Sequence, residues 1–141
     1  MRTMNITKIR SVCIIDDDPI FIYGTKRIMK EVDFSDEIIV YNNGQDAIEG
    51  LQQITDNGKE LPSIIFLDLN MPIMNGWEFL DHFTEKPNNN QEDILIYIIS
   101  SSVDPRDIAR IQDYDIVNNY ILKPITIEDL HKILKNTGGF N

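Results

Sequence analysis

Hydrophobic residues gather into five short runs that alternate with longer amphipathic stretches along the chain. The runs occupy 11–15, 37–41, 64–67, 94–99 and 119–122, and polar or turn-forming residues follow each of them. A short and nearly continuous apolar run is typical of a strand buried on both faces, as in a parallel sheet. We therefore predict five parallel strands.

Each intervening stretch begins with residues typical of a helix N-terminus. These starts are Asp18-Pro19, Asn43, Asn75-Gly76, Asp104-Pro105 and the capping-box-like Thr126-Ile127-Glu128-Asp129. The third helix is predicted from Gly76 to about Lys86. In the first helix, an inward-facing set is expected to include Ile20, Phe21, Tyr23, Gly24, Ile28 and Val32.

Five strands that alternate with five helices indicate a doubly wound α/β fold with right-handed crossovers and helices on both faces of the sheet. The 141 residues suit one domain that spans 1–141. We expect a polar lead over 1–10 and a frayed tail over 137–141.

Composition narrows the function classes. Acidic residues outnumber basic ones 23 to 13, and the formal charge of −10 argues against direct nucleic-acid binding and favours a cation or a basic partner. Cys13 is the one cysteine and lies in an apolar run, which fits core packing and a reducing compartment. The apolar runs are too short for membrane insertion, and the amino end lacks a signal-peptide core, so a cytoplasmic location is expected.

Polar side chains follow four of the predicted strands: Asp16 and Asp17, Asp68, Ser100, and Lys123. The carboxyl ends of parallel strands meet at one edge of the sheet, where ligands of open α/β folds bind. We therefore expect these residues to form one site.

The site is predicted to hold a divalent cation. Three carboxylates placed together raise each other's pKa unless a cation lies among them. Mg²⁺ suits a small acidic cup because it keeps several waters and takes few protein carboxylates, and Mn²⁺ can substitute. An aspartate here could attack phosphorus to form an acyl phosphate, while Lys123 and Ser100 bind phosphoryl oxygens.

Each piece alone also fits a purely structural role. The aspartates at 16–18 suit a helix N-terminus, Lys123 suits a solvated turn, and Ser100 to Ser102 suit a cap. Their joint placement at strand ends is what favours chemistry.

The motifs resemble the receiver domain of two-component response regulators over nearly the whole chain. The matching segments are 14–19, Leu67 to Pro72 with Asn75-Gly76, Ile99-Ser100-Ser101, and Tyr120 to Pro124. The resemblance implies a flavodoxin-like strand order 2-1-3-4-5. It also implies that Asp68 accepts a phosphoryl group from a phosphohistidine, with Mg²⁺ bound by Asp16, Asp17, Asp68 and the backbone carbonyl of Asn70.

The same resemblance assigns roles around the phosphoacceptor. Ser100 and Tyr120 correspond to the switch residues, Asn70 and Ser102 to positions that tune phosphate lifetime, and the Lys123–Pro124 bond is expected to be cis. Phosphorylation would pull Ser100 inward and Tyr120 after it. The surface of the fourth helix, fifth strand and fifth helix, including 111–114 and 125–130, would then change.

The expected protein is therefore a signalling phosphoacceptor in a phosphorelay and not an enzyme beyond self-phosphorylation and self-dephosphorylation. Its implied partners are a sensor histidine kinase or phosphotransfer protein, a downstream protein, and a second copy in a phosphorylation-dependent homodimer. Met1 and the short tail favour a free-standing receiver over an excised piece.

Two alternatives stay open at this point. Asp16-Asp17-Asp18 also fits a phosphatase of the haloacid dehalogenase type, with Asp16 as nucleophile and Asp18 as acid, although Ile20 departs from that motif. The other alternative is a phosphate-independent interaction module of the same fold.

Overall fold

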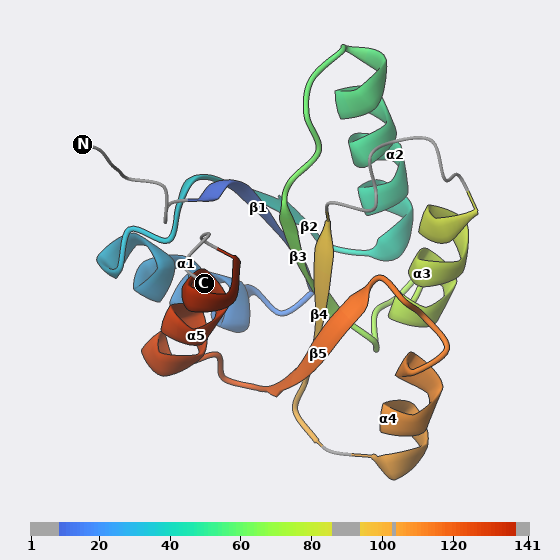
Figure 1. The fold of residues 1–141 in the computed structure, drawn as a ribbon. Helices are drawn as coiled ribbons and strands as arrows, with labels where there is room; N and C mark the ends of the chain where they lie inside the picture. Colours follow the sequence, from blue (N-terminus) through green and yellow to red (C-terminus); the bar gives the residue numbers. More distant parts are fainter. Residues whose placement is uncertain (1–8, 86–93, 103, 138–141) are drawn as a thin grey trace.

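A five-stranded parallel sheet with helices on both faces forms the molecule (Figure 1). The structure is a computed structural model that describes residues 9–85, 94–102 and 104–137. Its strands are β1 (Ile9–Ile15), β2 (Ser35–Tyr41), β3 (Ile64–Asp68), β4 (Leu95–Ser100) and β5 (Val117–Leu122). Its helices are α1 (Pro19–Glu31), α2 (Gly44–Asp56), α3 (Gly76–Thr84), α4 (Pro105–Ile111) and α5 (Ile127–Thr137).

The strand order is β2-β1-β3-β4-β5, and every neighbouring pair is parallel. This order confirms the predicted doubly wound α/β fold. The chain reverses direction across the sheet after β2, so the ends of β1 and β3 lie side by side at the point where ligands of such folds bind.

Two hydrophobic clusters sandwich the sheet. One joins Cys13, Ile15 and Leu67 to α2 and α3, and the other joins Ile14 and Phe66 to α1 and α5. Figure 1 shows α1 and α5 on one face of the sheet and α2, α3 and α4 on the other. Adjacent residues of a central strand thus point into different clusters, which is why these strands read as unbroken apolar runs.

The predicted helix caps are confirmed. The Asp18 side chain accepts hydrogen bonds from the N–H groups of Ile20 and Phe21, and Asn43 and Asp104 cap α2 and α4 in the same way. Asn75 and Glu78 form a reciprocal capping box, and Thr126 and Asp129 do likewise before α5. Local sequence therefore fixes where each helix begins.

Several strand and helix bounds differ from the predictions. β1 begins at Ile9, inside the predicted polar lead, because Ile9 pairs with Ser35 of β2 and donates a backbone hydrogen bond to Phe34. β2 and β5 each begin two residues before the predicted start, at Ser35 and Val117. β4 runs from Leu95 to Ser100, and α3 ends at Thr84. The predicted helix end at Lys86 and most of the predicted tail lie outside the described residues.

The predicted inward face of α1 is partly wrong. Ile20 is 82% exposed and Tyr23 is 67% exposed, and Gly24 is also exposed. The buried residues of α1 are Phe21, Thr25 and Met29, at the four-residue spacing of one stripe. Ile28 and Val32 pack against the core as predicted, whereas Ile20 and Tyr23 lie off the buried stripe.

No helix in the described part of the chain combines the length and the apolar character needed to cross a bilayer.

Candidate functional site

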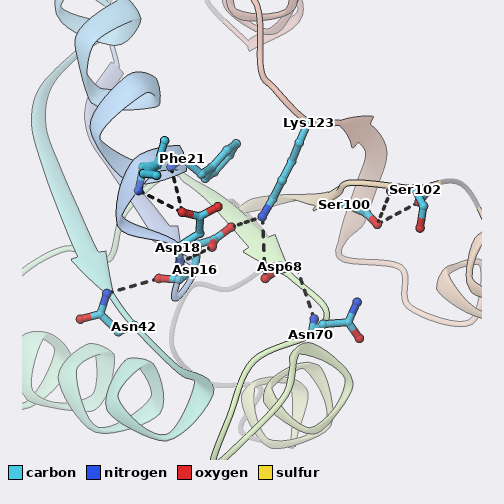
Figure 2. A network of polar contacts seen from close by, with 10 residues as sticks. Asp16, Asp18, Phe21, Asn42, Asp68, Asn70, Ser100, Ser102 and Lys123 are labelled. Carbon is cyan, nitrogen blue, oxygen red and sulfur yellow. Dashed lines mark hydrogen bonds and ion pairs between the residues drawn. The ribbon is translucent and has the colours of Figure 1, made fainter.

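The strand register brings the predicted site residues to one edge of the sheet (Figure 2). Ile15 pairs with Leu67, so Asp16 and Asp68 follow at the ends of adjacent strands. Asp68 pairs with Ile99, and Ser100 pairs with Leu122, the residue before Lys123. The backbone N–H of Lys123 donates to the carbonyl of Ser100 at 2.8 Å, which continues the ladder beyond β5.

Lys123 lies between two of the carboxylates. Its ammonium nitrogen is 2.7 Å from Oδ2 of Asp16 and 3.8 Å from Oδ2 of Asp68. It also lies 4.4 Å from the ring centre of Phe21, a cation–π contact. Two carboxylates and an aromatic face therefore hold this ammonium at the strand edge.

Backbone N–H groups orient the two buried carboxylates. Oδ1 of Asp16 accepts from the N–H of Asp18 at 2.8 Å, and Oδ1 of Asp68 accepts from the N–H of Asn70 at 3.3 Å. On Asp16, this leaves Oδ2 buried, and this oxygen has no aligned hydrogen-bond donor among the described residues, although it forms the ion pair with Lys123. Oδ2 therefore has capacity for a further ligand.

Burial and like charge raise the pKa of both carboxyl groups. The Asp68 pKa is raised to about 6, first by burial and then by the nearby charge of Asp16, against the opposing effect of Lys123. Burial likewise raises the pKa of Asp16, while Lys123 and the N–H of Asp18 oppose the rise. The predicted mutual repulsion is thus present, and one ammonium does not compensate it.

Three carboxylates form a compact ligand set. One oxygen from each of Asp16, Asp17 and Asp68 can be chosen so that all lie within 4.8 Å of one another. Asp17 is exposed, whereas Asp16 and Asp68 are buried, so the set opens to solvent on one side. Oxygen donors of this kind suit a hard divalent cation that keeps some of its waters.

Ser100, Ser102 and Tyr120 form a second hydrogen-bonded group along the same edge. The carbonyl oxygen of Ser102 accepts from the Ser100 hydroxyl at 2.9 Å and also from the Tyr120 hydroxyl. The N–H of Ser102 donates back to the Ser100 oxygen at 3.3 Å. No hydrogen bond joins Ser100 to Asp68 in the described part of the structure, so this group is adjacent to the carboxylates and separate from them.

The structure thus brings together Asp16, Asp17, Asp68 and Lys123, and it places Asn70 against Asp68. The Lys123–Pro124 bond is cis, as the resemblance implies. Asp18 caps α1, so it serves the helix start.

Two contributors were not anticipated from the sequence. Phe21 contacts Lys123, and the Asn42 amide donates to the backbone carbonyl of Asp16 at 3.3 Å. Asn42 directly follows β2, so its place after a strand was an available signal. Phe21 carried no such signal, because an apolar residue of an amphipathic helix is expected only in the core.

Comparisons with known proteins agree with this geometry. The family model described as "Response regulator receiver domain" matches residues 12–135. A two-component response regulator from Cytophaga hutchinsonii, known from its crystal structure, is 36% identical, with 92% of this chain and 98% of that chain covered and a TM-score of 0.82. The Mn²⁺-bound form of response regulator Rcp1 is 23% identical, with 93% of each chain covered and a TM-score of 0.70.

A longer relative also matches. The nitrate/nitrite response regulator protein NarL of Escherichia coli K12 is 31% identical over 124 residues, which cover 88% of this chain and 52% of NarL. The chain therefore spans about half the length of that relative. With the match to 12–135 covering both acidic strand ends and Lys123, the chain belongs to the response regulator receiver domain family.

Proposed function

We propose that this receiver domain accepts a phosphoryl group on Asp68 from a phosphohistidine of a sensor kinase or phosphotransfer protein. The observation that carries the proposal is the position of Asp68. Its carboxylate ends a central strand, is oriented by the Asn70 N–H, and lies within reach of both Lys123 and the Asp16–Asp17 pair.

In the transfer, a carboxylate oxygen of Asp68 forms a bond to phosphorus while the phosphorus–nitrogen bond of phosphohistidine breaks. The imidazole leaves with the bonding electron pair, and Asp68 becomes an acyl phosphate. Lys123 supplies a fixed positive charge next to the new phosphoryl oxygens, where developing negative charge needs stabilisation. Positioning and charge neutralisation are the main requirements of such a step, and this chain provides both.

The residues also fit a divalent cation, and we assign Mg²⁺ to the site, with Mn²⁺ able to substitute. The fit rests on the three clustered carboxylate oxygens and on the buried Oδ2 of Asp16 that lacks an aligned donor. Asp16, Asp17 and Asp68 would hold the ion, together with the backbone carbonyl of Asn70. When bound, the cation neutralises charge on the phosphoryl oxygens. The Mn²⁺-bound form of Rcp1, which shares the fold, supports this assignment.

The hydrogen-bonded group at Ser102 supports a switch. Ser100 and Tyr120 both donate to the Ser102 carbonyl. An inward turn of the Ser100 hydroxyl toward a phosphoryl group would break its hydrogen bond to Ser102, and Tyr120 would follow into the space that Ser100 vacates. The equilibrium between conformations of the surface formed by α4, β5 and α5 would then shift toward one that binds a downstream protein or a second copy. Asn70, whose N–H donates to Asp68, and Ser102, which is hydrogen-bonded to Ser100, would tune the lifetime of the phosphoryl group. The receiver itself would act as a cytoplasmic signalling domain over the whole chain.

The test is Mg²⁺-dependent labelling by acetyl phosphate, with hydroxylamine sensitivity to identify an acyl phosphate. We expect wild-type protein and Asp115→Asn, an exposed control, to be labelled equally and Asp68→Asn to remain unlabelled. Stoichiometric labelling of Asp68→Asn would refute the assignment, and labelling at Asp16 would point to the phosphatase alternative. A wild-type protein that never reacts would leave a phosphate-independent interaction module.

A further inference from the structure

A groove lies between α1 and the end of β2. Its volume is about 630 Å³. Ile22 and Val40 form apolar lining, and both also pack against the buried core. Tyr23, Lys26, Arg27 and Lys30 line the rest of the α1 side. The groove thus combines an apolar floor with a cationic rim.

The three cations on this rim are unusual for a chain with a formal charge of −10. Lys26, Arg27 and Lys30 come from adjacent turns of α1, and Arg27 and Lys30 are exposed. Within the described residues, no carboxylate forms a salt bridge with any of the three, whereas Arg106 and Lys123 do have acidic partners. Their charge is therefore free to attract an anionic group.

The lining of the groove extends along α1. Its α1 lining recurs at helical spacing from Pro19 to Lys30, which corresponds to about 16 Å along the helix. Tyr23, although 67% exposed, adds an aromatic surface at the rim. A lining that follows α1 over this length, with apolar and aromatic residues in its first half and cations in its second half, suits an extended segment better than a compact small molecule.

We propose that this groove binds an acidic segment of a partner protein. Its carboxylates would meet Lys26, Arg27 and Lys30, and a neighbouring aliphatic or aromatic side chain would contact Ile22 and Val40. This binding goes beyond phosphoryl transfer, since none of these residues belongs to the phosphoacceptor site. A nucleic acid fits poorly, because three cations within one helix must compete with a strongly acidic remainder of the molecule.

The groove also adjoins the phosphoacceptor edge. Asn42 lines the groove and donates to the backbone carbonyl of Asp16. A segment bound there would lie next to the acidic site without covering Asp68. The two activities can therefore be measured separately.

The test uses fluorescence anisotropy with a fluorescein-labelled peptide of about eight residues, in which Glu alternates with Leu, long enough to span the groove. We expect saturable binding that weakens with salt. The triple variant Lys26→Glu, Arg27→Glu, Lys30→Glu should weaken binding by about tenfold or more. A control with the same charge change at exposed lysines elsewhere, Lys59→Glu, Lys132→Glu, Lys135→Glu, should bind within about twofold of wild type.

Other outcomes would overturn the proposal. These are absence of binding, equal weakening in both triple variants, equally tight binding of a peptide with Ser in place of Leu, or equally tight binding of a DNA duplex at the same residues. A change of sedimentation mass in the groove variant without peptide would assign the groove to a second copy instead. Circular dichroism would verify folding. Unchanged acetyl phosphate labelling of the groove variant would show that phosphorylation of Asp68 does not depend on the groove residues.

Discussion

The Lys123 ammonium lies 2.7 Å from a carboxylate oxygen of Asp16, although the two residues come from nearly opposite ends of the chain. The Asp16 side chain is fully buried, and that of Lys123 is 16% exposed. A buried carboxylate needs a compensating charge, and this ammonium supplies it in the absence of any other cation among the described residues near the site. The pair therefore belongs both to the stability of the fold and to the proposed chemistry.

Removing the ammonium should destabilise the metal-free protein. Lys123→Met keeps most of the aliphatic stem but leaves Asp16 unpaired, and we expect a loss of about 2 kcal/mol in the free energy of unfolding at pH 7. Urea denaturation in the presence of a chelator measures it. Lys132→Met, at an exposed position of α5, is the control. An unchanged midpoint for Lys123→Met would show that the pair does not stabilise the fold.

Removing the Asp68 carboxyl group should stabilise the metal-free protein, and the size of this effect should depend on pH. The Asp68 pKa is raised from 3.8 to about 6, so the folded state disfavours the ionised carboxylate. The carboxylate therefore lowers the free energy of unfolding progressively as the pH rises from about 4 to about 6. In Asp68→Asn without metal, we expect the free energy of unfolding at pH 8 to rise by up to about 3 kcal/mol, because the raised pKa already includes the attraction to Lys123. Near pH 4 the gain should vanish.

Chemical denaturation at both pH values would measure this difference. The exposed control Asp115→Asn should change the free energy of unfolding by the same small amount at both pH values. A gain of equal size at pH 4 and pH 8 would contradict the raised pKa.

Metal addition should stabilise the protein through the carboxylate cluster. We expect MgCl₂ to raise the melting temperature, with about 1.4 kcal/mol of added stability when the free ion is at ten times its dissociation constant. Asp17→Asn should raise the dissociation constant for Mg²⁺ about tenfold or more. It should have little effect on the stability of the metal-free protein, because Asp17 is exposed. KCl at equal ionic strength separates binding from screening of the net charge. Equal stabilisation by KCl would exclude a specific site.

The close approach of α3 to the end of β3 makes Gly76 sensitive to substitution. A Cβ at Gly76 would lie 2.6 Å from the carbonyl oxygen of Asp68 and 2.8 Å from the Cα of Leu69, and both are backbone atoms that cannot rotate away. Gly76→Ala should therefore destabilise by about 2 kcal/mol or more. Gly24→Ala is the matched control within α1, where nothing lies within 4 Å, and should stabilise by up to about 1 kcal/mol. Thermal melts that rank the two variants equally would contradict the close approach.

Much of the fold follows from local signals in the sequence. Helix starts could be predicted at Asp18, Asn43 and Asp104, because an N-cap side chain bonds to N–H groups within the first turn of its own helix. The acidic and basic strand ends could be gathered into one site because parallel strands share an edge. The sequence alone therefore predicts that Asp68 and Lys123 lie together, and the structure confirms it.

What the sequence left open depends on contacts between distant segments. The exposure of Ile20 and Tyr23 follows from how α1 is rotated against the sheet, and helical periodicity alone fits either rotation. The contact of Phe21 with Lys123 and the position of Asn42 beside Asp16 likewise appear only when the register is fixed. Strand starts such as Ile9 were missed because the partner strand, and not the residue's neighbours, determines them.

The strand order has a consequence for synthesis of the protein on the ribosome. The carboxylate site needs the ends of β1 and β3 and also Lys123, which follows β5. Among the five strands, β5 comes last in the chain and is therefore the last to leave the ribosome. A nascent chain halted before Lys123 would hold the three clustered acids without the ammonium that lies between Asp16 and Asp68. Competence to receive a signal should therefore arise only after the ribosome has made the segment that follows β5, so that chains halted earlier stay silent.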